Sequence, residues 1–151
     1  MRVEYINPFV ESAFNVLKEV LQGEVKRGEL YLKSTSIPVM GVAAIVGLAG
    51  DVEGRVLFDM DKPTALKVAS VMNGEELKVM DELVKATITE LANMITGNAM
   101  NIFAYAGKRI EITTPTVIDG KNFTITHVKQ TTLAISLYSP FGQLEMNVAL
   151  K

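Results

Sequence analysis

The chain has no cysteine and no tryptophan among its 151 residues, and it has one histidine. Without cysteine, neither disulfides nor thiolate metal sites can form. A nucleophilic triad cannot be built credibly from one histidine and no cysteine. His127 stands in a segment rich in Thr and Lys, where a structural role is more usual than metal ligation. We therefore expect no metal site and no resident cofactor.

Long apolar runs are also missing, so no segment reaches the length of a membrane span. The first residues, 1–5, carry an early acid rather than the apolar core of a signal peptide. The formal net charge of -2 argues against a general nucleic-acid or acidic-membrane surface. These features favour a cytoplasmic protein that binds neither nucleic acid nor membrane.

The composition is that of an ordinary globular chain, with 48% hydrophobic and 21% charged residues. A chain of 151 residues can bury a substantial core. It contains no low-complexity segment and no linker long enough to divide it. We expect one domain covering residues 1–151.

The order of predicted elements indicates an α+β fold with an antiparallel sheet packed against helices. Asn7 and Pro8 are predicted to open the first helix, and Gly23 to stop it. The later predicted elements are a strand over 29–39, a hairpin of 43–48 and 55–60, a short helix over 64–72, a long helix over 81–105, a strand over 110–114, a turn at Asp119-Gly120, and a closing hairpin of 133–138 and 144–150.

The long helix has two distinct faces at a spacing of about 100° per residue. One face is apolar and should enter the core; its residues are Val84, Ile88, Leu91, Ile95, Ala99 and Ile102. The opposite face is a narrow stripe of small and polar residues: Ala86, Glu90, Asn93, Gly97 and Asn101. This stripe, called the α-stripe below, could be laid against the surface of another protein.

The two halves of the chain are alike, which indicates a helix–strand–hairpin unit used twice. Asn15 in the first helix corresponds to Asn93 in the long one. A proline follows each asparagine at a similar distance, as Pro38 and Pro115. Ser12 stands in the first copy where Glu90 stands in the second, so one site would be intact and the other degenerate.

Glu90-x-x-Asn93 on a long helix, with Pro115 following Asn93 by 22 residues, resembles the signature of the CheC/CheX/FliY family of CheY-phosphate phosphatases. A single intact pair and a short chain fit the CheX branch better than CheC. The family often has Asp or Ser four residues before the Glu, and Ala86 departs from that pattern. The resemblance covers nearly the whole chain.

The resemblance implies a pseudo-two-fold α+β fold and dephosphorylation of a CheY-like response regulator in bacterial chemotaxis. Asn93 would orient the attacking water, and Glu90 would contact the regulator's active-site lysine. Ala86, Gly97 and Asn101 would contact the same partner, with Gly97 allowing close approach. Mg²⁺ would be supplied by the phosphorylated regulator.

A homodimer is also expected. The closing segment 148–150 is apolar and has few charges, and an exposed strand edge invites pairing. The resemblance adds that CheX-type chains dimerise by joining sheets.

Less specific interpretations remain beside these. Glu90 and Asn93 taken alone would be read as solvated surface residues, and Gly97 could serve helix packing instead. The alternative function is a non-enzymatic regulator-binding or flagellar-switch adaptor module of the same fold. Nothing in the sequence specifically supports a small-molecule sensor domain of the same α+β class.

Overall fold

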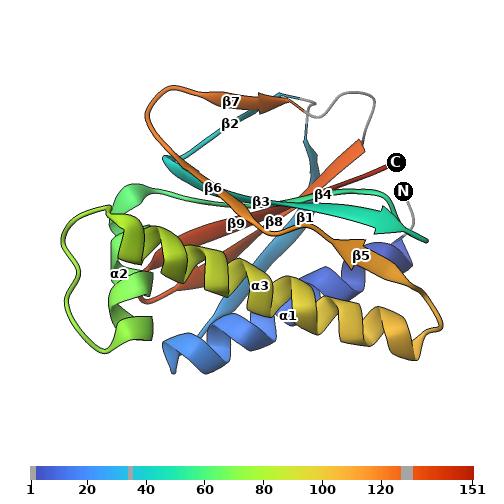
Figure 1. Ribbon diagram of the computed structural model, residues 1–151, viewed down its shortest axis with the longest axis horizontal. Coiled ribbons are helices and arrows are strands. Elements are labelled where there is room, and N and C mark those ends of the chain that lie inside the picture. The colour runs from blue at the N-terminus through green and yellow to red at the C-terminus, as the bar shows by residue number, and fades with distance from the viewer. Residues whose placement is uncertain (1–2, 34–35, 127–130) are drawn as a thin grey trace.

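The computed structural model describes residues 3–33, 36–126 and 131–151 of the chain. Its main sheet is antiparallel, in the order β1-β8-β9-β4-β3-β5, with β6 also pairing with β3 (Figure 1). The strands of this sheet are β1 (Lys26–Lys33), β3 (Val42–Gly50), β4 (Gly54–Met60), β5 (Ile110–Ile112), β6 (Thr116–Asp119), β8 (Thr131–Ser139) and β9 (Gly142–Leu150). The predicted α+β class is confirmed.

The described residues form three helices, which cover one face of this sheet (Figure 1). They are α1 (Val3–Leu21), α2 (Lys62–Asn73) and α3 (Glu82–Tyr105). The predicted short and long helices are therefore confirmed within two residues. Within the described residues, no helix is both long and apolar enough to cross a lipid bilayer.

Helix α1 begins earlier than predicted, because Asn7 and Pro8 lie inside it. A proline in a helix removes one backbone hydrogen bond, so the sequence favours a start there. Tertiary packing overrides this preference: Phe9 is fully buried, and its ring centroid lies 5.4 Å from that of Phe103 on α3. The helix ends at Leu21, before Gly23, since Gln22 already adopts a left-handed conformation with φ 47°.

Helix α3 is defined by clear signals at both ends. The Asp81 side chain accepts a hydrogen bond from the backbone N–H of Val84, which caps the first turn. At the other end, Gly107 has φ 76°, and the N–H of Lys108 donates to the carbonyl of Phe103. The left-handed glycine and this hydrogen bond form a typical helix C-cap. The predicted apolar face is buried, apart from Ile102, which is half-buried.

The predicted strand over 29–39 is wrong as one element. It divides into β1 and the short strand β2 (Ser36–Pro38), which belongs to a separate ribbon with β7 (Thr124–Thr126). Residues 34–35 and His127, with the expectations attached to them, lie outside the described residues. The ribbon crosses the sheet face opposite the helices (Figure 1). There Ile125 packs with Ala43 and Leu57.

The closing strand β9 does not lie at a sheet edge, so that part of the dimer reasoning is wrong. It is central, hydrogen-bonded to β8 on one side and to β4 on the other. In the described part of the main sheet, β1 ends the strand order on one side and β5 on the other. On β1, Leu32 is 70% exposed.

The sheet carries the internal symmetry that the repeat predicts. The hairpin β3–β4 and the hairpin β8–β9 lie next to each other at its centre. Gly54 and Gly142 begin the second strand of each hairpin, with φ values of 152° and 134°. A side chain at Gly54 would collide with the carbonyl of Ala149, and one at Gly142 with Thr64. Glycine is required at both matching positions.

Candidate functional site on helix α3

The α-stripe lies on the side of α3 that the core leaves uncovered. Ala86, Glu90 and Asn101 are exposed, whereas Asn93 and Gly97 are half-buried. The structure therefore brings all five predicted site residues onto one accessible helix face.

Glu90 and Asn93 place a carboxylate and a carboxamide one helical turn apart, with Cβ atoms about 5–6 Å from each other. Among the described residues, neither side chain has a hydrogen-bonding or ionic partner. Behind them, Ile88, Leu91 and Ile95 are buried and fix the helix against the sheet. The pair is thus rigidly presented and available to a partner molecule.

Gly97 faces open space. A Cβ atom added there would meet nothing within 4 Å outside the helix's own backbone. Packing of Gly97 against another helix of the same chain is therefore not the reason for a glycine at this position. The missing side chain leaves the helix backbone accessible one turn beyond Asn93.

Pro115 is buried in the connection between β5 and β6, and both of these strands pack against α3. Thr113 fixes the same connection to β3. Its hydroxyl accepts from the N–H of Gly47 at 2.8 Å, and its own N–H donates to the Gly47 carbonyl at 3.0 Å. The proline segment therefore belongs to the support beneath the long helix.

Lys85 adds a contact that the sequence did not reveal. Its ammonium group lies 3.3 Å from the Asp119 carboxylate at the end of β6. The partner is 34 positions away, so no local pattern could indicate it. This ion pair joins α3 to the sheet directly beside Ala86.

The corresponding region of α1 cannot reproduce the pair. Ser12 is completely buried, and its hydroxyl has no partner, so the residue that replaces Glu90 does not reach the surface. Asn15 is exposed and borders a shallow hollow with Glu11 and Arg27. The first copy of the repeat keeps the three-residue spacing but has a buried hydroxyl where the second has an exposed carboxylate.

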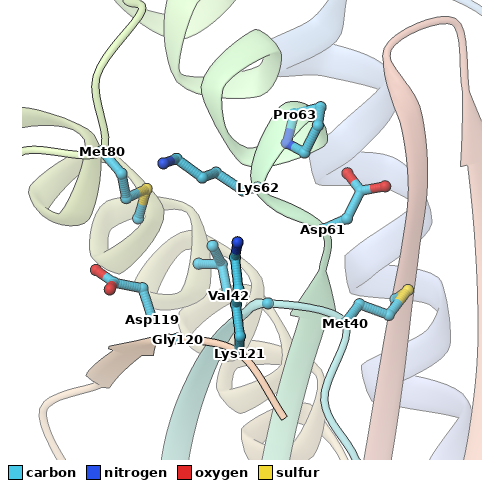
Figure 2. Close-up of a pocket in the computed structure, with 10 residues that line it drawn as sticks. Met40, Val42, Asp61, Lys62, Pro63, Met80, Asp119, Gly120 and Lys121 are labelled. Atoms are coloured by element: carbon cyan, nitrogen blue, oxygen red, sulfur yellow. The ribbon is translucent and has the colours of Figure 1, made fainter.

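A better-enclosed hollow of about 370 Å³ lies near the starts of α2 and α3 (Figure 2). Its carboxylates are already engaged, since Asp61 caps the N–H of Thr64 and Asp119 pairs with Lys85. Lys62 and Lys121 also line it. This hollow offers no arrangement of a free acid and base, so the α-stripe remains the better candidate.

Tyr105 is the second feature that sequence reasoning missed. It is 96% exposed at the last residue of α3. Together with Asn101 and Ala104 it borders a surface hollow of about 390 Å³. Its spacing of four residues from Asn101, within the last turn of α3, is the sequence signal that could have indicated this arrangement.

An antiparallel sheet with internal two-fold symmetry, and a long helix presenting one Glu-x-x-Asn pair, define the CheC/CheX-like class of proteins. The sequence profile described as "Chemotaxis phosphatase CheX" matches residues 42–137. The chain belongs to this family.

Relatives agree over most of the chain. The "CheY-P phosphatase CheX" of Thermotoga maritima is 32% identical over 126 residues, which is 83% of this chain and 81% of the relative. A crystal structure of a CheX–CheY–BeF3–Mg complex from Borrelia burgdorferi superposes with a TM-score of 0.87, at 38% identity and 99% coverage of both chains. CheX from Desulfovibrio desulfuricans gives a TM-score of 0.88 at 29% identity, covering 98% of this chain and 99% of that one.

Proposed function

We propose that this chain is a phosphatase that hydrolyses the aspartyl-phosphate of a CheY-like response regulator in chemotaxis signalling. Family membership, the Thermotoga maritima relative and the Borrelia burgdorferi complex support this proposal. The observation that carries it is the unpartnered Glu90–Asn93 pair on an outward face of α3.

In the proposed reaction, a water oxygen attacks the phosphorus in line with the bond to the aspartate oxygen. That bond breaks, and inorganic phosphate and the free aspartate are released. Catalysis of phosphoryl transfer depends mostly on positioning and charge stabilisation. The Asn93 carboxamide suits this task, since its oxygen accepts from water while its nitrogen donates to a phosphoryl oxygen. Asn93 does not titrate, so its contribution is geometric.

Glu90 has a separate role in the proposal. A carboxylate is an acceptor only, and it forms charge-assisted bonds with an ammonium group. We assign it to the active-site lysine of the regulator, which would fix the position of α3 over the phosphoryl group. Ala86, Gly97 and Asn101 would contact the surrounding surface of the regulator. The Borrelia burgdorferi complex includes Mg²⁺, and we propose that here too the ion arrives with the regulator.

Three variants at two positions test the assignments. Asn93→Ala should lower the rate of phosphate release by about 10² or more, corresponding to about 3 kcal/mol of transition-state stabilisation. Its affinity for a CheY-like regulator loaded with beryllofluoride and Mg²⁺ should stay close to that of the wild type. Glu90→Ala should weaken both affinity and turnover, and Glu90→Gln should fall between, because it keeps the shape without the charge.

The measurements are phosphate release from a panel of phosphorylated regulators, calorimetric affinity for the beryllofluoride form, and the thermal midpoint. All three variants should keep the wild-type midpoint, since the α-stripe lies outside the core. Wild-type hydrolysis by Asn93→Ala would refute the catalytic assignment. A wild-type chain that binds the regulator without releasing phosphate would establish the adaptor alternative.

We also propose that the chain is a homodimer. With β9 at the centre of the sheet, we assign the joining of sheets to the β1 edge rather than the β5 edge, because Leu30, Tyr31 and Leu32 of β1 are all exposed. Helix α3 packs on β3, β5 and β6, at the other side of the sheet. Pairing through β1 would therefore leave Glu90 and Asn93 free.

A further inference from the structure

Tyr105 is an aromatic residue left almost entirely in solvent, at the end of the helix that carries Glu90 and Asn93. Large aromatic side chains bury much apolar area and are enriched at the centres of protein interfaces. We propose that Tyr105 is a docking residue for the phosphorylated regulator. The inference rests on the proposed function and extends its contact surface beyond the α-stripe.

The distances along α3 allow one partner to touch both places. Tyr105 follows Asn93 by twelve positions, which corresponds to about 18 Å at the rise of an α-helix. A standard protein interface covers about 800 Å² on each partner, equivalent to a disc about 30 Å across. At 100° per residue, Tyr105 lies about 120° around the helix axis from Asn93 but only about 40° from Asn101. A regulator positioned over the α-stripe would therefore reach Tyr105 on the flank of α3 next to Asn101.

Two surface hollows connect the last residue of the α-stripe with Tyr105 and its neighbours. Asn101, on the α-stripe, borders the hollow that contains Tyr105, and it also borders a second hollow of about 500 Å³. Lys108 and Arg109 line this second hollow. The Tyr105 ring and the two cations therefore lie on either side of Asn101. The surface beyond the α-stripe is aromatic and positively charged, whereas the α-stripe itself is small and polar.

These residues define the complementary surface on the regulator. The ring of Tyr105 suits an apolar side chain that enters the hollow beside Asn101. Arg109 is exposed, and its backbone is fixed because its N–H donates to the Asp51 carboxylate at 2.7 Å. Its guanidinium suits a carboxylate on the regulator. The proposed contact surface of the regulator therefore carries an apolar residue flanked by an acidic one.

Two substitutions of Tyr105 separate loss of the ring from loss of the hydroxyl. Tyr105→Ala should weaken binding of the beryllofluoride- and Mg²⁺-loaded regulator by about tenfold or more, as is usual for an aromatic anchor. Tyr105→Phe should bind within about twofold of the wild type, because the ring supplies the contact area. Val79→Ala is the matched control: Val79 is also largely exposed, but it lies in the connection before α3, at the end of that helix opposite Tyr105.

The kinetic signature differs from that of the catalytic pair. Tyr105→Ala should raise KM for the phosphorylated regulator about tenfold and keep kcat within about twofold, since the ring does not approach the reacting atoms. Arg109→Gln should reduce the dependence of affinity on salt.

Wild-type affinity and KM for Tyr105→Ala would overturn the inference, and the effect of Asn93→Ala on hydrolysis would still test the proposed function separately. A change in solution mass of Tyr105→Ala by light scattering would also overturn it, because the ring would then serve the contact between copies of this chain.

Discussion

Asp59 and Glu145 lie directly opposite each other on the paired strands β4 and β9, and both are buried on the sheet face away from the helices. The Lys33 ammonium contacts Glu145, and the N–H of Met40 donates to both oxygens of Asp59 at 3.0 and 3.2 Å. Burial raises the pKa of Asp59 from 3.8 to about 6, and the charge of Glu145 acts in the same direction. The Met40 hydrogen bond and Lys33 oppose this rise in the pKa.

This pKa predicts a pH-dependent stability. Because the folded state holds the proton of Asp59 more tightly than the unfolded state, the stabilisation is complete below pH 4 and is lost as the pH rises to about 6. Asp59→Asn keeps an acceptor for Met40 and does not titrate. Relative to this variant, the wild type should lose about 2 kcal/mol of unfolding free energy between pH 4 and pH 7. Urea titrations across this range measure the difference, with Glu76→Gln as an exposed control. A difference independent of pH would contradict the prediction.

Substitutions at Gly97 should affect stability and activity in opposite directions. An added side chain meets no neighbour, and alanine is favoured over glycine within a helix by about 1 kcal/mol. Gly97→Ala should therefore raise the thermal midpoint. Gly97→Leu should fold normally but raise KM for the phosphorylated regulator, because its bulk separates α3 from the partner. Lys67→Leu on α2 is the exposed control. Unchanged KM in Gly97→Leu would mean that this surface is not approached.

Asn15 should be dispensable for hydrolysis. Its neighbour Ser12 is buried and cannot act as Glu90 does. Asn15→Ala should keep phosphate release within about twofold of the wild type, as expected of an exposed position outside the working site. A loss comparable to that of Asn93→Ala would show that α1 also contributes a site.

The proposed dimer can be disrupted at the β1 edge. A charged residue on an edge strand opposes strand-to-strand pairing. Leu32→Glu should convert a dimeric mass to a monomeric mass by light scattering at tens of micromolar, with phosphate release retained at the α-stripe. Val79→Glu is the control, since Val79 is 66% exposed in the connection before α3. A monomeric wild type would refute the dimer.

Local patterns were sufficient to predict the helices and hairpins. Asp81 and Gly107 mark the ends of α3, and the apolar spacing between them identifies its buried face. The α-stripe followed from the same periodicity. Periodicity alone does not predict that the α-stripe is accessible, because accessibility depends on how the other elements pack around α3.

The errors arose where distant contacts decide local structure. The burial of Phe9 against Phe103 extends α1 past Pro8, against the preference of that residue. The apolar composition of segment 148–150 is equally typical of a free edge and of a strand paired on both sides, and β9 is paired on both sides. Tyr105 and the Lys85–Asp119 pair depend on positions that only the folded chain brings together.

The strand order has a consequence for how the chain can be divided. Strand β1 of the first repeat pairs with β8 of the second, and β5 and β6 of the second repeat pair with β3 of the first. The two repeats also meet at the centre of the sheet, where β4 pairs with β9. Neither repeat holds its own outer strand, so the repeats are not independent folding modules. A chain cut within residues 74–80, between α2 and α3, would yield two fragments that rebuild the sheet only by complementing each other.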